Sequence, residues 1–133
     1  VTALPRECLL ESNSDFIFIS EAELTLQRLI HAPRDHWQDV PGVCVNQAGG
    51  ARLGPATEMV ANLDDLPYPA RNLTPWQLYR MPFSRGEPFA TVIPSRGCPY
   101  PCTFCRAGSV WGRGIRTRSV ENLLGVVRAG RPV

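Results

Sequence analysis

The sequence predicts an α/β fold built from two strand–helix units that a proline-rich connection separates. Each unit begins with a continuous apolar run, at residues 15–20 and again at residues 89–95, and each run precedes an amphipathic segment. Most of the 13 prolines lie between Pro55 and Pro101, and hydrophobic periodicity disappears between about residues 63 and 88. We therefore expect domain segments at residues 1–62 and 89–133, with a linker at residues 63–88.

The first unit is predicted to be a buried strand followed directly by a helix. The run "DFIFIS", Asp15 to Ser20, is typical of a strand covered on both faces in a parallel sheet. Ser20 and Glu23 have the spacing of a helix capping box, and Pro33 is expected to end the helix. The helix carries a stripe of residues with a second pair beside it: Ala22, Leu26 and Ile30, then Thr25 and Leu29.

A hairpin and an extended connection are predicted between the two units. Residues 43–47 and 51–53 are predicted to form the two short strands of a small hairpin, turned at Gly49 and Gly50. The linker that follows, "NLDDLPYPARNLTP", has prolines at positions 67, 69 and 75, which disfavour regular structure. We expect the linker to run as an extended strap over the surface.

The second unit repeats the order of strand and helix around a long loop. "FATVIPS", Phe89 to Ser95, predicts another buried strand. Ser119 is expected to cap the helix in "RSVENLLGVVRA", because its hydroxyl can accept a hydrogen bond in the first turn. The buried side of this helix is predicted to comprise Leu123, Leu124, Val126 and Val127.

Composition excludes several classes of protein. The hydrophobic fraction of 44% and the charged fraction of 20% are those of a soluble globular protein. A net charge of +2 gives no argument for a nucleic-acid partner, and no apolar run reaches the roughly 20 residues of a membrane span. Five cysteines without an export signal favour metal chemistry in a reducing compartment, so we expect a cytoplasmic protein.

Three of these cysteines form the most informative pattern in the chain. Cys98, Cys102 and Cys105 have the spacing C-x3-C-x2-C. Structural zinc sites and ferredoxin clusters use four protein ligands, and neither Cys8 nor Cys44 has a suitable spacing to supply the fourth. We expect those two to behave as small apolar residues. Three thiolates suggest a metal site that keeps one position open, and a purely structural or zinc role is the alternative.

The stretch "IPSRGCPYPCTFCRAGSVWGRGIRTRS" resembles the start of a radical S-adenosylmethionine (SAM) enzyme, which has a TIM-type barrel. The resemblance implies a [4Fe-4S] cluster on Cys98, Cys102 and Cys105, with SAM chelating the open iron. It also implies that a reductant such as ferredoxin or flavodoxin reduces the cluster, which then cleaves SAM to methionine and a 5′-deoxyadenosyl radical. Phe104 fills the aromatic position of the pattern and is implied to lie near the SAM adenine.

The upstream segments "SDFIFISEAELTLQRLI", "VPGVCV" and "LDDLPYPARNL" resemble the end of a Rossmann-like cobalamin-binding domain and its linker. The family usually has Gly-Glu-Gly-Glu where this chain has Ser20-Glu21-Ala22-Glu23, so both glycines are lost. The family's cobalamin-binding histidine motif would precede residue 1, and its glycine-rich SAM segment would follow residue 133. We therefore expect a fragment across two domains, with an incomplete barrel and no activity on its own.

The resemblance implies a cobalamin-dependent radical SAM enzyme that performs methyl transfer or radical cyclisation on a small-molecule substrate. The alternative is a non-catalytic iron–sulfur or zinc-binding module. Arg116 and Arg118 belong to a pattern "W-G-x-x-x-R-x-R-S" of the family. They are either solvated loop charges or, for one of them, the partner of a carboxylate inside the barrel. No residue is assigned a role in catalysis itself.

Overall fold

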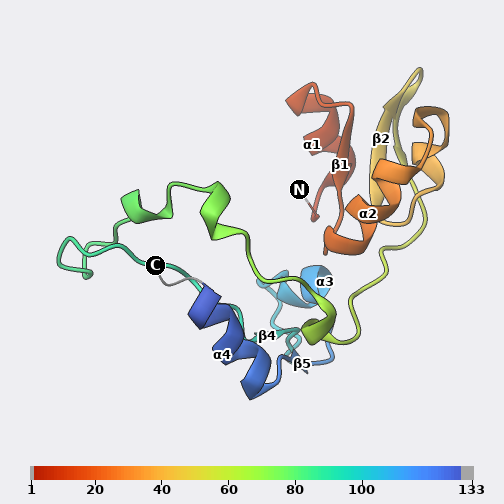
Figure 1. Ribbon diagram of the computed structural model, residues 1–133. Helices are drawn as coiled ribbons and strands as arrows, with labels where there is room; N and C mark the ends of the chain where they lie inside the picture. The colour runs from red at the N-terminus through yellow and green to blue at the C-terminus, as the bar shows by residue number, and fades with distance from the viewer. Residues whose placement is uncertain (1, 130–133) are drawn as a thin grey trace. The chain divides into compact units, whose positions relative to one another are not determined.

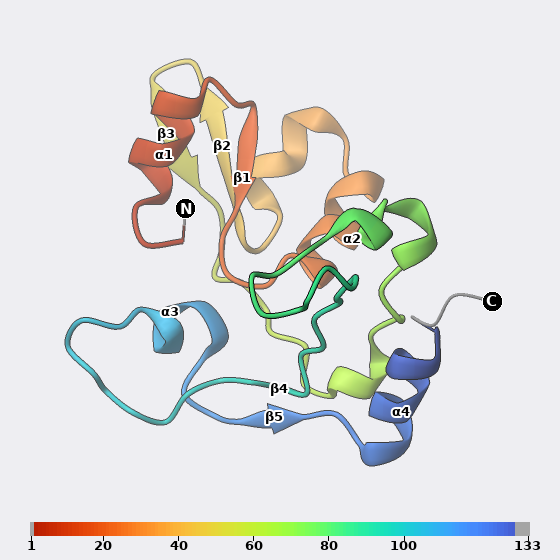
Figure 2. The same ribbon diagram turned by 90° about the vertical axis from the view of Figure 1, so that its left-hand side faces the viewer.

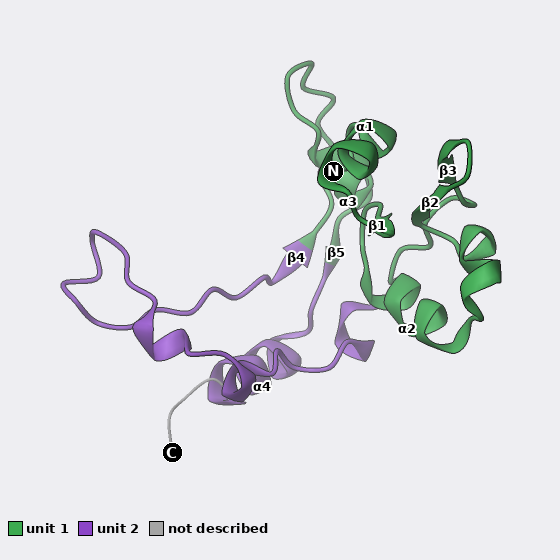
Figure 3. Cartoon of the chain, turned by 90° about the horizontal axis from the view of Figure 1, so that it is seen from above, with its two compact units in different colours: residues 1–61, 96–116 green, residues 62–95, 117–133 purple. Residues whose placement is uncertain are grey.

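The computed structural model describes residues 2–129, and Figure 1 labels the elements along the chain. Residues 1 and 130–133, at the outer ends of the two expected domain segments, lie outside this description. The chain divides into two compact units, which Figure 3 distinguishes by colour. Unit 1 comprises residues 1–61 and 96–116, and unit 2 comprises residues 62–95 and 117–133. The cysteine loop therefore belongs to the same unit as the first strand and helix.

Unit 1 contains a three-stranded antiparallel sheet, in the order β1 (Phe16–Phe18), β2 (Val43–Gln47) and β3 (Gly50–Leu53). Figure 2 shows the three strands side by side. Helix α1 (Pro5–Ser12) packs on one face of the sheet, where Leu9 meets Cys44 and Ala51. On the other face, Leu29 of α2 (Glu23–His31) packs against Val43 and Val45.

The expected parallel sheet is wrong for β1, because β1 pairs antiparallel with β2, Ile17 lying opposite Cys44. The apolar run correctly indicated a strand with apolar neighbours on both faces. It carried no information on strand direction, since α1 and α2 cover an antiparallel strand as well as they would a parallel one. The predicted hairpin is confirmed, with Gln47 opposite Gly50. Gly49 and Gly50 both have positive φ, as a tight turn requires.

Helix α2 ends at His31, before Pro33, as predicted. The capping box is wrong: Ala22 occupies the N-cap position without a side-chain cap, and the Ser20 hydroxyl instead donates to the carbonyl of Val110. Thr25 and Leu29 form the buried side of the helix, whereas Leu26 and Ile30 are 48% and 68% exposed. The stripe that packs is thus the second of the two that the sequence offered, since Leu29 lies against Val43 and Val45 of the sheet.

The strand expected at residues 89–95 is mostly absent. Only Ser95 and Arg96 form a strand, β4, which pairs with β5 (Arg116–Thr117). Residues 89–94 have no regular structure, and Ile93 is 52% exposed. Pro88 and Pro94 supply no N–H donor at either end of the run, which weakens a ladder there.

Unit 2 otherwise consists of the linker and α4 (Val120–Ala129). The linker lacks strands, as predicted, but it is not simply extended, since 3₁₀ turns occur at residues 63–65, 71–73 and 76–78. The Ser119 cap is confirmed, because its hydroxyl accepts a hydrogen bond from the Asn122 amide at 3.1 Å. Val126 is buried as expected, whereas Leu124 and Val127 are largely exposed. Among the described residues, none of the helices has both the length and the apolarity to cross a membrane.

Candidate functional site

The base of the cysteine loop is tightly closed. Gly97 has a φ of +107°, and a Cβ atom added there would lie 2.0 Å from the carbonyl oxygen of Gly114. Next to it, the Cys98 amide donates to the Gly112 carbonyl at 3.0 Å. Glycine is therefore required at position 97 for two reasons, its positive φ and the approach of the opposite backbone.

The three clustered cysteines project from this loop as free thiols. Cys98 is partly buried, and Cys102 and Cys105 are exposed. The Ala107 amide, at the start of α3 (Ala107–Trp111), lies 3.4 Å from the Cys105 sulfur and donates to it. Phe104, which lies between Cys102 and Cys105 in the sequence, is 92% exposed. Within residues 2–129, no three side chains of His, Cys, Asp or Glu are grouped as a metal would need.

The donor chemistry nevertheless fits an iron–sulfur cluster. The thiols are free of disulfide bonds, two of them are exposed, and the Ala107 amide donates a hydrogen bond to one of the sulfurs. The assignment of Cys98, Cys102 and Cys105 as ligands, and of Phe104 as a SAM contact, stays a prediction.

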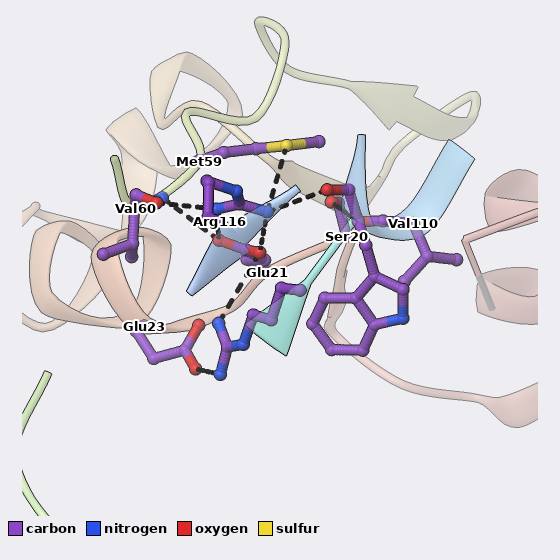
Figure 4. A network of polar contacts seen from close by, with 9 residues as sticks. Ser20, Glu21, Glu23, Met59, Val60, Val110 and Arg116 are labelled. Atoms are coloured by element: carbon purple, nitrogen blue, oxygen red, sulfur yellow. Dashed lines mark hydrogen bonds and ion pairs between the residues drawn. The ribbon is translucent and has the colours of Figure 1, made fainter. Parts of the chain in front are cut away.

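The loop region also contributes to a buried ion pair, of which the sequence had indicated the arginine but not the carboxylate. Arg116 donates to both carboxylate oxygens of Glu21, at 2.6 and 3.0 Å (Figure 4). The Glu21 side chain is 1% exposed and that of Arg116 is 16% exposed, so the pair is shielded from water. Arg116 also donates to the carbonyls of Val60 and Trp111, at 2.6 and 2.8 Å. This two-pronged geometry is the strong form of an arginine–carboxylate contact.

Of the two arginines considered in the sequence, Arg116 is thus the one that meets a carboxylate. Its partner comes from the Ser-Glu-Ala-Glu segment, far upstream in the sequence. Arg118 instead donates to the side-chain amide oxygen of Asn122, at 2.7 Å. The retained glutamates of that segment were the signal that could have identified the partner.

A second arginine at the other end of the loop meets the same segment. Arg96 donates to Glu23 at 2.5 Å and lies 3.6 Å from Glu21. Its guanidinium stacks 5.1 Å from the centre of the Trp111 ring, a cation–π contact. One of its nitrogens, Nη1, is buried and makes no hydrogen bond within the described part of the chain.

The charges in this cluster shift each other's protonation. Burial by itself raises the pKa of Glu21, but hydrogen bonds from Arg116 and Val60 and the two arginine charges hold it below its ordinary 4.5. Burial acts the same way on Glu23, and its hydrogen bond from Arg96 likewise leaves its pKa lowered. The pKa of Arg96 is raised, because the two carboxylates outweigh the effect of its burial. Glu21, Glu23 and Arg96 are therefore charged at neutral pH.

The two remaining cysteines lie away from the loop. Cys44 is completely buried against Leu9 and Ala51, as expected of a small apolar residue, and burial raises the pKa of its thiol. Cys8 lies on α1 and is partly buried.

Comparisons with known proteins identify the kind of chain to which this site belongs. No family model matches the chain. It is 31% identical to an uncharacterised methyltransferase of Pyrococcus horikoshii over 112 residues, which cover 83% of this chain and 24% of that protein. It is 35% identical to the hopanoid C-3 methylase of Methylococcus capsulatus over 83% of this chain and 21% of the methylase. A cytidylyl-2-hydroxyethylphosphonate methyltransferase of Streptomyces wedmorensis is 28% identical over 90% of this chain and 28% of the relative.

The fold is similar to part of a solved structure, the radical SAM methyltransferase TsrM of Kitasatospora setae with cobalamin and a [4Fe-4S] cluster bound. The TM-score is 0.63 at 17% identity, over 96% of this chain and 26% of TsrM. The chain thus has the mixed α/β fold of a segment of a radical SAM methyltransferase. The expected resemblance is confirmed to this extent: the sequence is similar to methyltransferases, and the fold is similar to part of a radical SAM methyltransferase. The chain spans about a quarter of the length of the curated relatives it matches.

Proposed function

We propose that the chain is the cluster-holding segment of a cobalamin-dependent radical SAM methyltransferase. The observation that carries the proposal is the C-x3-C-x2-C loop, whose free thiols occur in a chain related to methyltransferases. In this proposal residues 1–62 are the end of a Rossmann-like cobalamin-binding domain and residues 63–88 its linker. Residues 89–133 then begin a TIM-type radical SAM barrel.

The three thiolates would each hold one iron of a [4Fe-4S] cluster. The Ala107 amide, which donates to the Cys105 sulfur, would help to orient that ligand. A cluster held by these residues and reduced by a carrier such as ferredoxin or flavodoxin would supply the electron needed to cleave SAM to methionine and a 5′-deoxyadenosyl radical. The exposed ring of Phe104 is available to contact the SAM adenine.

Methyl transfer is favoured over radical cyclisation, because the three curated relatives all have names of methyl-transferring enzymes. Cobalamin is the expected carrier of the methyl group, and a small molecule the expected acceptor. The alternative is a non-catalytic iron–sulfur or zinc module that uses the same three free thiols.

The test of this proposal is anaerobic reconstitution of the purified chain with iron and sulfide. We expect one [4Fe-4S] cluster, and we expect Cys98→Ala, Cys102→Ala or Cys105→Ala each to abolish it, as measured by iron and sulfide content and by the absorption spectrum. Cys8→Ala, on the partly buried helix α1, is the matched control and should retain the cluster. Loss of the cluster in Cys8→Ala, or preferential uptake of zinc, would contradict the three-ligand assignment.

A further inference from the structure

We propose that Glu21 is a positioning residue for the cysteine loop, acting through Arg116. A carboxylate upstream of the linker would then fix the base of the loop that carries the three thiols. The inference deepens the proposed function and rests on it only for the behaviour of the cluster. Its first test needs no metal.

The segment at residues 20–23 contacts the loop region at three places. Arg96 and Arg116, the first and last residues of the loop region in unit 1, both bind its carboxylates. The Ser20 hydroxyl donates to the Val110 carbonyl in α3, between the two ends. One short segment thus holds the loop at its start, at its helix and at its end (Figure 4).

The two carboxylates of this segment, Glu21 and Glu23, differ in their burial and in the number of their contacts. Glu21 is the buried partner and accepts two hydrogen bonds from Arg116 and a third, at 3.0 Å, from the Val60 amide. Glu23 is 37% exposed and makes one contact to Arg96. Removing the Glu21 charge would leave Arg116 shielded from water with only neutral acceptors, which is the costly way to break such a pair. We therefore assign the larger effect to Glu21.

Arg116 is linked through the backbone to Cys98, the first of the three proposed cluster ligands. Arg116 donates to the Trp111 carbonyl, and the next residue, Gly112, accepts the hydrogen bond from the Cys98 amide. The carbonyl that Arg116 contacts and the carbonyl that holds the Cys98 amide therefore belong to consecutive peptide units. An Arg116 side chain released from Glu21 would loosen Trp111 and Gly112, and the Cys98 amide with them.

The experiment compares Glu21→Gln with Glu58→Gln in the metal-free chain. Glu58 pairs with Arg28 at 2.5 Å, but both of those side chains are about half exposed, so this variant removes a carboxylate from a solvated pair as a matched control. We expect the Cys98 amide to exchange its hydrogen at least about tenfold faster in Glu21→Gln, and alkylation of Cys98 to accelerate relative to Cys102. Glu58→Gln should leave both rates unchanged.

Protection of the amides in β1, β2 and β3 decides whether the effect is local. If the protection of these sheet amides persists while the Cys98 amide exchanges faster, the positioning role stands. Arg116→Lys, which keeps the charge but loses the two-pronged contact, should loosen Cys98 in the same way. Unchanged Cys98 exchange in both folded variants would overturn the proposal. Loss of protection across the whole sheet in both would overturn it too, because Glu21 would then have a general structural role.

The reconstituted protein supplies a second readout. We expect Glu21→Gln to change the electron paramagnetic resonance (EPR) signal of the reduced cluster, whereas Glu58→Gln should not. If the unaltered chain takes up no cluster, the proposed function fails, and the metal-free measurements still decide the role of Glu21. If the cluster forms and its signal is the same in both variants, the proposed function stands and control of the cluster by Glu21 is refuted.

Discussion

Ser20 has a φ of +65°, in the left-handed region that favours glycine. It stands at the first glycine of the Gly-Glu-Gly-Glu pattern that the sequence resemblance implies, and a residue other than glycine in this conformation costs about 1 kcal/mol. Its hydroxyl offsets that cost by donating to the Val110 carbonyl. Ala22, at the second lost glycine, has an ordinary helical conformation and needs no such compensation.

This account predicts different results for two substitutions of Ser20. Ser20→Gly relieves the backbone and loses the hydrogen bond, so its free energy of unfolding should stay within about 1 kcal/mol of the original. Ser20→Ala keeps the strain and loses the bond, so it should be less stable by about 1 kcal/mol. Urea denaturation followed by circular dichroism measures both. Equal stabilities of the two variants would contradict the strain assigned to the backbone at position 20, and a Ser20→Ala variant as stable as the original chain would contradict the role given to the hydroxyl.

Glu21 predicts a dependence of stability on pH. Its pKa in the folded chain is lowered below the ordinary 4.5, so ionised Glu21 stabilises the fold fully above that value. The contribution is lost as the pH falls below 4.5 and through the lowered pKa. Compared with Glu21→Gln, the original chain should be more stable by about 2 kcal/mol at pH 7, and this difference should shrink in acid. Urea midpoints at several pH values test this, and a difference independent of pH would refute it.

At the scale of elements, the sequence predicted those features that depend on local chemistry. The turn at Gly49 and Gly50, the end of α2 before Pro33 and the Ser119 cap all follow from the conformational preferences of single residues. The direction of β1, the absence of a full strand at residues 89–95 and the burial of Leu29 rather than Ile30 depend on partners distant in sequence. An apolar run indicates that a segment is buried, but it gives no information on which strand pairs with that segment.

The same reasoning applies to the candidate site. The three cysteines were identified by their spacing, a local property. The contact between Arg116 and Glu21 joins residues on opposite sides of the linker, and the retained glutamates alone did not specify the pairing. The sequence offered a carboxylate partner as one of two alternatives and expected it inside the barrel, whereas Glu21 lies upstream of the linker.

The closed base of the loop predicts the effect of one added methyl group. Gly97→Ala would place a Cβ atom 2.0 Å from the Gly114 carbonyl oxygen at a positive φ, so the two backbone segments must separate. We expect the Cys98 amide to lose its bond to Gly112 and cluster content after reconstitution to fall severalfold. Gly86→Ala also changes a glycine of positive φ, but no atom lies within 4 Å of its added Cβ, so it serves as the control. Normal loading of Gly97→Ala would show that the closed base is dispensable.

At the scale of the whole molecule, the chain combines a small antiparallel sheet, its two covering helices and the cysteine loop in one unit. The loop is held from behind by buried charges, while two of its thiols are exposed. Rigid support beneath accessible ligands suits a cluster that must also bind a second molecule. The likeness to a segment of methyltransferases is consistent with this arrangement.

The central claim is that the three cysteines hold a cluster with one iron left open for SAM. The most direct measurement is the EPR spectrum of the reduced, reconstituted protein with and without saturating SAM. If the cluster has only three protein ligands, SAM can bind the open iron, and we predict that it changes the signal. Phe104→Ala should raise the SAM concentration needed, by an amount equivalent to about 1 kcal/mol. A spectrum that saturating SAM leaves unchanged would contradict the claim and favour a non-catalytic metal-binding module.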